Sequence, residues 1–241
     1  MEEVIPGALY LVSTPIGNLG DITYRAVFIL NNITLIAAED TRTTSILLAK
    51  YNINKKMIAY HSYNQQVQTP KIIELLRRGN SIALVSDAGT PGILDPAYHL
   101  VTSCIKENIR IIPVPGPSAF LTALIASGLP ANRFVFEGFL PLKKGRKTKI
   151  EMLAGEERTI ILYESPHRLL KTIEELLAAW GDRSCVMGRE LTKIYEEFFR
   201  GTFSDLINHL RSKTLKGEVV MIITGCKTTK NKNDLVLRFY S

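Results

Sequence analysis

Residues 82–96 join a short apolar run to a rigid loop, and this join is the feature that most restricts the fold. Ile82 to Val85 is an unbroken apolar stretch with the length of a buried strand. The loop that follows, Ser86 to Pro96, carries Asp87 and Asp95 among glycines and prolines that restrict its backbone. Open α/β sheets bind ligands at the carboxyl ends of their strands. The pattern therefore predicts a ligand site, although the same aspartates would also serve to cap the next helix.

A second segment repeats this arrangement. Arg110 to Val114 is an apolar run that leads into Pro115-Gly116-Pro117-Ser118-Ala119, just before a helix of small residues. Pro117 suits the first turn of that helix, and Ser118 can offer a hydroxyl and a backbone N–H to a ligand. We expect this loop to face the same ligand as the loop after Val85.

A third run, Ile33 to Ala38, precedes Glu39-Asp40-Thr41-Arg42. These residues place carboxylates and a guanidinium at the same sheet edge, so Glu39, Asp40 and Arg42 are the candidate catalytic residues. Arg42 could clamp a phosphate, while Glu39 or Asp40 could accept a proton or fix Arg42. The competing interpretation is that Asp40 or Thr41 caps the next helix and Arg42 pairs with Glu39.

The order of the apolar runs predicts two α/β domains. In the first half, strands are expected at 8–13, 33–38, 82–85 and 110–114, alternating with helices near 22–31, 43–51, 70–78, 98–107 and 118–127. In the second half, strands are expected at 134–139, 159–163, 184–189, 197–202 and 218–224, with helices near 147–153, 166–180 and 203–211. We therefore predict domains at 1–120, with a mostly parallel sheet, and 121–241, with a mixed sheet, and a ligand crevice between them.

Composition and charge restrict the class of protein. With 46% hydrophobic and 22% charged residues, the 241-residue chain has the composition of a soluble globular protein. No apolar stretch is long enough to span a bilayer, and the acidic start lacks a signal peptide's basic region, so a cytoplasmic location is expected. The three cysteines are far apart and lack a ligand spacing, so no metal site is predicted. The net charge of +7 favours a polyanionic partner.

Basic residues gather in one loop, which reads Lys143-Lys144-Gly145-Arg146-Lys147-Thr148-Lys149. Lys143, Lys144, Arg146 and Lys147 could follow a phosphate backbone. The alternative is a solvated, mobile connection between domains.

Five ordered motifs resemble one family, the tetrapyrrole methylase superfamily of class III S-adenosylmethionine-dependent methyltransferases, and within it the branch that methylates small-subunit ribosomal RNA. The motifs are Leu9 to Asp21, Ala38 to Arg42, Ser86 to Pro96, Pro113 to Ala119, and Leu162 to Arg168. The resemblance implies S-adenosylmethionine as the cofactor, folded into the crevice. It also implies a set of cofactor contacts: Pro15, Asp87, Gly89, Thr90, Ser118, Ala119 and Tyr163, and with weaker motifs Leu191 and Val219. For Leu191 and Val219, core packing is an equal alternative.

The same resemblance implies 2′-O-methylation of a cytidine in 16S ribosomal RNA of the small subunit, near the decoding centre, by a homodimer. His167, Arg168 and Arg189 could join the basic loop in contacting that RNA, although an exposed helix face is the ordinary explanation for such residues. Two other functions stay open: C-methylation of a precorrin-type tetrapyrrole, and a ribosome-binding factor without turnover.

The resemblance covers roughly residues 7–225. The family commonly continues into a further small region, whereas Lys227 to Ser241 is a short tail rich in lysine and asparagine. We therefore expect weaker binding of the substrate or a greater need for the dimer partner.

Overall fold

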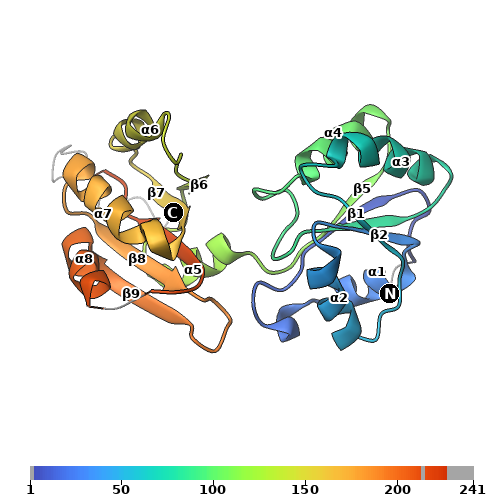
Figure 1. The fold of residues 1–241 in the computed structure, drawn as a ribbon, viewed down its shortest axis with the longest axis horizontal. Coiled ribbons are helices and arrows are strands. Elements are labelled where there is room, and N and C mark those ends of the chain that lie inside the picture. Colours follow the sequence, from blue (N-terminus) through green and yellow to red (C-terminus); the bar gives the residue numbers. More distant parts are fainter. Residues whose placement is uncertain (1–2, 213–214, 227–241) are drawn as a thin grey trace, which may run out of the picture. The chain divides into compact units, whose positions relative to one another are not determined.

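A computed structural model describes residues 3–212 and 215–226 of the chain (Figure 1). The short tail from Lys227, where the sequence departs from the family pattern, lies outside these residues, so the expectation of weaker substrate binding stays a prediction. The chain forms two compact units: the first comprises Met1–Thr122 and Leu191–Ile194, and the second Ala123–Glu190 and the chain from Tyr195. The crevice expected between 1–120 and 121–241 stays a prediction.

The first unit is built on a five-stranded sheet in which every strand pair is parallel, as the alternating pattern predicts. In sheet order the strands are β3 (Met57–Ala59), β2 (Leu35–Ala38), β4 (Ile82–Val85), β1 (Leu9–Val12) and β5 (Ile111–Val114). Because parallel strands share a direction, the loops after β1, β2, β3, β4 and β5 all leave from one edge of the sheet. That edge is where the sequence places the ligand.

Helices cover both faces of this sheet, and each face has its own core (Figure 1). One core joins the sheet to α1 (Tyr24–Asn32) and α2 (Thr41–Lys50). The other joins it to α3 (Gln65–Arg77) and α4 (Ala97–Lys106). With both faces covered, the central strands carry apolar residues throughout, and β2 and β4 are buried at every position.

Two elements of the first unit differ from the sequence pattern. Strand β3 is not among the expected strands, because its apolar run is only three residues long and lies half-buried at the sheet edge. Helix α3 begins five residues before the expected start, so that Pro70 lies inside it rather than in its first turn.

The second unit is built on a five-stranded mixed sheet, as predicted. Its strands in sheet order are β6 (Phe134–Phe139), β7 (Thr159–Glu164), β10 (Val219–Ile223), β8 (Ser184–Arg189) and β9 (Glu197–Thr202). Only β6 and β7 pair in parallel. The core lies between this sheet and α6 (Arg146–Leu153), α7 (Pro166–Trp180) and α8 (Phe203–Arg211).

Helix α5 (Ala119–Ser127) spans the boundary at Thr122. Within residues 3–212 and 215–226, none of the helices has both the length and the apolar character needed to cross a bilayer.

Candidate functional site

Hydrogen bonds lock together the three glycine- and proline-rich loops of the first unit. Thr14 and Gly89 exchange two backbone hydrogen bonds, of 2.9 and 3.0 Å, which join the loop after β1 to the loop after β4. The Ser13 hydroxyl donates to Thr90 Oγ1 at 3.0 Å, and the Thr90 hydroxyl donates to the Pro117 carbonyl at 3.1 Å. The loop after β5 is thereby tied to the other two. The predicted cofactor residues Pro15, Gly89 and Thr90 thus belong to one rigid assembly.

Two glycines allow this close contact. Gly89 has a φ of +81°, a left-handed conformation that other residues adopt with strain. A Cβ on Gly116 would lie 2.9 Å from Ser13 Cβ, closer than carbon atoms pack. The loops can therefore approach one another only with these residues at these positions.

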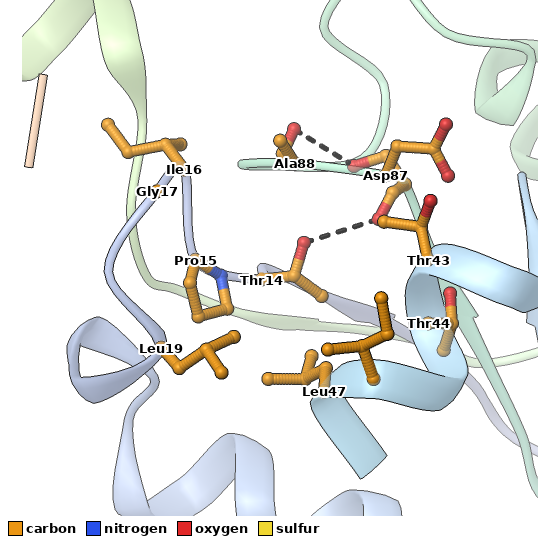
Figure 2. Close-up of a pocket in the computed structure, with 12 residues that line it drawn as sticks. Thr14, Pro15, Ile16, Gly17, Leu19, Thr43, Thr44, Leu47, Asp87 and Ala88 are labelled. Atoms are coloured by element: carbon orange, nitrogen blue, oxygen red, sulfur yellow. Dashed lines mark hydrogen bonds between the residues drawn. The ribbon is translucent and has the colours of Figure 1, made fainter. Parts of the chain in front are cut away.

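A cavity of ≈ 210 Å³ opens beside the loops (Figure 2). Pro15, Ile16, Leu19 and Leu47 give it an apolar wall. Its polar lining comes from the loop after β4 and the start of α2: Thr43, Thr44, Ser86 and Asp87, together with Thr14. The Thr14 hydroxyl donates to the Ser86 carbonyl at 3.2 Å (Figure 2). The cavity therefore combines an apolar surface with hydroxyl groups and one carboxylate.

Glu39 and Asp87 connect the carboxyl ends of β2 and β4. Asp87 Oδ1 accepts the Asp40 N–H at 2.9 Å, and Glu39 Oε2 accepts the Asp87 N–H at 3.3 Å. Asp87 does not cap α4. The N-cap of α4 is Pro96, and Asp95 Oδ1 accepts the N–H of Ala97, the first residue of the helix, at 2.8 Å. The two functional loops predicted by sequence are thus joined through their carboxylates.

Asp40 caps helix α2 and pairs with Arg42. Its carboxylate accepts the Arg42 backbone N–H at 2.8 Å and the Arg42 Nη2–H at 2.6 Å. The Arg42 guanidinium lowers the pKa of Asp40 to about 2. The capping alternative therefore applies to Asp40, but the partner of Arg42 is Asp40 and not Glu39. Because the Arg42 side chain is 89% exposed, its guanidinium remains accessible to an anion.

Glu39 has the opposite electrostatic environment. Burial raises the pKa of its carboxyl group, and the nearby carboxylates of Asp87 and Asp95 raise it further. The Asp87 N–H and His61 act against this rise. Of the two adjacent carboxylates, Glu39 is thus the one whose protonation state is the easier to change.

Other predicted cofactor residues lie on both units. Ser118 and Ala119 are half-buried at the start of α5, where the Ser118 carbonyl accepts the Thr122 N–H. Leu191 is buried in a segment of the first unit that packs on the loop after β1. Tyr163 and Val219 lie on β7 and β10 of the second unit, so a role for them at the cofactor stays a prediction.

The segment Leu191–Ile194 is held against Gly17 and Asn18. The Asn18 N–H donates to Thr192 Oγ1 at 3.1 Å, and a Cβ on Gly17 would lie 3.0 Å from the Leu191 carbonyl oxygen. Thr192 adopts a φ of +65°, which is rare for a β-branched residue. This strained segment closes one side of the first loop.

In the second unit, the basic loop divides into anchored and exposed residues. Arg146 is anchored: its guanidinium donates to Glu175 at 2.7 Å, to Thr172 at 2.8 Å and to the Pro141 carbonyl at 3.1 Å. The exposed members are Lys143, Lys144 and Lys147. Arg146 thus fastens α6 to α7, and the lysines are left to face solvent.

A buried carboxylate continues this network. Glu164, at the end of β7, accepts the Thr172 hydroxyl at 2.8 Å and pairs with Arg168. Arg189 pairs with Glu197 at 3.0 Å. Of the three further residues predicted to contact RNA, only His167 is exposed, since Arg168 and Arg189 are partly buried by these contacts.

His61 is a residue of this edge that the sequence did not single out as functional. It follows β3 directly after Tyr60, and its Nδ1 is buried without a hydrogen-bond partner among the described residues. Recognising β3 as a strand would have placed this histidine at the carboxyl edge of the sheet, one strand away from the loop that carries Glu39.

Comparison with known proteins identifies the class that this fold and this site define. The model of the family Tetrapyrrole (Corrin/Porphyrin) Methylases matches residues 8–207. A solved structure of a cobalt precorrin-4 methyltransferase of cobalamin biosynthesis superposes with a TM-score of 0.69, covering 90% of this chain and 95% of its own, at 19% identity. The protein is thus a methyltransferase of the class that uses S-adenosylmethionine as methyl donor.

Two relatives identify the branch of the methyltransferase class to which the chain belongs. A protein of Synechocystis named ribosomal RNA small subunit methyltransferase I is 52% identical over 91% of this chain and 79% of its own length. A protein of the same name from Thermotoga maritima is 46% identical over 91% of this chain and 99% of its own length. The chain therefore belongs to the tetrapyrrole methylase family and, within it, to the ribosomal RNA small subunit methyltransferase I family.

Proposed function

We propose that the protein transfers a methyl group from S-adenosylmethionine to the 2′ oxygen of a cytidine in 16S ribosomal RNA, within the small subunit near the decoding centre. The observation that carries this proposal is the 52% identity, over nine-tenths of the chain, to a relative named as a small-subunit ribosomal RNA methyltransferase. The carboxylate cluster at the sheet edge and the exposed lysines of the second unit support it.

The residues of the first unit fit S-adenosylmethionine. The apolar wall of Pro15, Ile16 and Leu47 suits the flat adenine ring, and the Asp87 carboxylate suits ribose hydroxyls or a positive charge. Gly89 brings backbone groups to the surface of the loop. When bound, the cofactor supplies a methyl group on a positively charged sulfur. The protein's task is then to align the acceptor oxygen and to exclude water.

Methylation of a hydroxyl also requires a group that removes its proton. Of the predicted catalytic residues, Glu39 is the better placed for this task, because Asp40 is committed to capping α2 and to Arg42. Arg42 is exposed and can bind a phosphate next to the target ribose. The division of roles is therefore proton handling by Glu39 and phosphate binding by Arg42.

The RNA contacts proposed for the second unit come from its exposed positive side chains. Lys143, Lys144 and Lys147 can reach phosphates as point charges. His167, which is exposed on α7, is a further candidate for an RNA contact. Arg146, Arg168 and Arg189 act differently in this proposal: their ion pairs hold the elements that carry the exposed residues. We also expect a homodimer in the cytoplasm, and light scattering would test the dimer against the monomer mass of 27.0 kDa.

The test is transfer of labelled methyl groups to small ribosomal subunits that lack the modification, followed by nuclease mapping. We expect label on the ribose of a cytidine. Replacing Asp87 by alanine should abolish transfer and weaken cofactor binding, whereas the exposed Asp21→Ala, in the same unit, serves as the matched control. Label on a uroporphyrinogen-type substrate instead would support tetrapyrrole methylation, and RNA binding without transfer would support a non-catalytic factor.

A further inference from the structure

A second cavity lies on the second unit, in a groove between α6 and α7. Its volume of ≈ 540 Å³ is within the range of about 300–1,000 Å³ that ligand sites occupy. The lining residues come from one side of α6, from Lys143 just before it, and from the last turns of α7. None of them lines the cavity beside the loops of the first unit. The groove is therefore a candidate site in its own right.

Hydrogen bonds fix the two helices that border the groove. The Arg146 guanidinium donates from Nε to Glu175 Oε2 at 2.7 Å. One turn further along α6, the Ile150 carbonyl accepts the Trp180 Nε1–H at 2.8 Å. Arg146 and Trp180 are both largely buried, so water does not compete freely for these bonds. The width of the groove is thus set before a ligand arrives, which lowers the entropic cost of binding.

The floor of the groove is apolar and built of small side chains. Ile150 is buried beneath it, whereas Ala178 and Ala179 are exposed. Because residues three and four apart share a helix face, Glu175, Ala178 and Ala179 lie together on one side of α7. Each alanine side chain ends at Cβ and leaves open the space that a longer side chain would fill. A planar ring can lie on such a surface, as bases do against apolar side chains in other nucleic-acid pockets.

The rim of the groove carries positive charges that are accessible to an anion. Lys143 is exposed, and the Lys147 side chain is 88% exposed. Lys147 Nζ lies 3.8 Å from Glu151 Oε1, and an exposed pair at this distance contributes little to stability. Lys147 can therefore exchange Glu151 for a phosphate. The rim thus suits a ligand that carries negative charge beside an uncharged ring.

Glu175 places a fixed hydrogen-bond acceptor in the same groove. Its Oε2 is held by Arg146, and its Oε1 lies 4.0 Å from Lys171 Nζ, too far for a hydrogen bond. Within the described part of the chain, Oε1 accepts no hydrogen bond. A carboxylate oxygen in this position matches the exocyclic amino group of a base, as Glu does with cytosine N4. Uracil presents an oxygen at the equivalent position, so the acceptor discriminates between the two pyrimidines.

We propose that the groove between α6 and α7 holds one unpaired nucleotide of the RNA substrate, other than the nucleotide that is methylated. The base lies on Ala178 and Ala179 and donates its amino group to Glu175, and the adjacent phosphates meet Lys143 and Lys147. This proposal rests on the proposed function, in which the substrate is RNA. It adds a contact that selects a base to contacts that only attract phosphates.

The length of the floor favours a nucleotide over a peptide. From Glu175 to Ala179 the floor spans about 6 Å, one helical turn. An amphipathic helix that docks in a groove uses anchors at i, i+3 or i+4, and i+7, which extend over roughly 10 Å. A single base fits this length, and the basic rim matches the phosphates on either side of it.

The experiment fills the groove with the double variant Ala178→Leu/Ala179→Leu. Leucine is a good helix former, so the melting temperature and the affinity for S-adenosylmethionine should stay unchanged. Filter binding to unmodified small subunits should show an affinity about 5–10-fold weaker at every salt concentration, the lower end of what one stacked base contributes. The slope of log affinity against log salt should be retained, because no lysine is lost. The matched control is Ala49→Leu, at an exposed helical position of the first unit, which should bind normally.

The base contact is tested with single-stranded 12-nucleotide probes of cytidine and of uridine. The unmodified protein should bind the cytidine probe more tightly, and the groove variant should bind both alike. Equal binding of both probes by the unmodified protein would contradict the role given to Glu175.

Three further results would overturn the proposal. One is label on the ribose together with full affinity of the groove variant for subunits, which leaves the proposed function intact. Another is a groove variant that binds protein-free 16S ribosomal RNA normally but subunits poorly, which would assign the groove to a segment of a ribosomal protein. The last is label on a tetrapyrrole and none on RNA, which would overturn the proposed function as well.

Discussion

Glu39 and Asp40 are adjacent in the sequence and have opposite electrostatic environments. The Arg42 guanidinium and the Arg42 backbone N–H hold Asp40 in its charged form. Burial and two further carboxylates make the charged form of Glu39 less favourable. Where an enzyme separates the pKa values of neighbouring groups in this way, the groups usually have separate tasks. The two environments therefore suit Asp40 to capping helix α2 and Glu39 to exchanging a proton.

Replacing Asp40 by asparagine should lower the free energy of unfolding above about pH 4 and leave it unchanged at more acid pH. Asparagine retains the helix cap but cannot pair with Arg42. Because the folded pKa of Asp40, about 2, lies below the usual 3.8, the ion pair stabilises the fold above about pH 4. This stabilisation is lost as the pH falls toward 2. Urea unfolding of both proteins across this range checks it, and a difference that persists unchanged at pH 2 would contradict it.

Replacing Glu39 by glutamine should stabilise the protein and impair catalysis. Glutamine can still accept the Asp87 N–H, but it carries no charge to be desolvated or repelled by Asp87 and Asp95. Solvent screening should keep the gain below about 1 kcal/mol, or roughly 2–4 °C in melting temperature. Since the folded pKa of Glu39 is raised, the gain should be present at neutral pH and vanish as Glu39 becomes protonated. Calorimetry at several pH values tests this, and a melting temperature below that of the unmodified protein at pH 7 would refute it.

At the scale of elements, function depends on loops that are locked to one another rather than on single helices or strands. Ser13, Thr90 and Pro117 tie the loops after β1, β4 and β5 together. Such a surface can hold a ligand with little loss of conformational entropy on binding, because the loops are ordered beforehand.

Gly116→Ala tests this lock. The added methyl group would lie 2.9 Å from Ser13 Cβ, so the loop after β5 must shift. We expect a loss of about 1–3 kcal/mol in stability and a weaker affinity for S-adenosylmethionine. The matched control is Gly155→Ala, where nothing lies within 4 Å of the new Cβ. Calorimetric titration of both variants with the cofactor gives the comparison, and equal affinities would show that the lock is unimportant for binding.

Most of the fold could be predicted from the sequence, because the central strands are continuous apolar runs. Ile82 to Val85 was identified to the residue, since a strand buried on both faces leaves a clear signal. The same reasoning missed β3, where three residues at a sheet edge carry little pattern. It also started α3 too late, because proline is usually a mark of the first helical turn.

The candidate site was predictable in its loops but not in its contacts. Glycines, prolines and aspartates after apolar runs mark a sheet edge, so Asp87 and Glu39 could be placed there. Which charge pairs with which depends on side-chain positions, and Arg42 could have joined either Glu39 or Asp40. His61 escaped notice for a related reason: without β3, nothing in the sequence brings it to the site. The sequence likewise does not reveal that Arg146 is held by Glu175 and Thr172, because these residues are distant in the chain.

On the scale of the whole molecule, the excess of positive charge matters for its partner. The net charge of +7 on 241 residues provides a general attraction to a polyanion, and the anchored arginines leave the lysines to make the local contacts. Attraction of this kind acts through counterion release from the nucleic acid and is weakened by salt.

A variant with Lys143, Lys144 and Lys147 all replaced by alanine should bind small subunits less tightly and with a weaker salt dependence. If each lysine meets one phosphate, the slope of log affinity against log salt should fall by about 2. Arg146→Ala is the informative comparison, because its loss should lower the melting temperature, whereas the lysine variant should melt as the unmodified protein does. Filter binding at a series of salt concentrations measures the slope. A slope that is unchanged in the lysine variant would remove the loop from the RNA interface.

The segment Leu191–Ile194 makes the order of synthesis relevant to this protein. It belongs to the first unit, yet the ribosome produces it only after Ala123–Glu190 of the second. Until Leu191–Ile194 has been synthesised, Gly17 and Asn18 of the first unit lack the segment that packs on them. At about 5–20 residues per second, the 72 residues from 123 to 194 take roughly 4–14 s. Within the first unit, the loop after β1 is thus the part of the candidate site that is completed last, and a pause in translation between these positions would prolong the interval in which this loop lacks its partner segment.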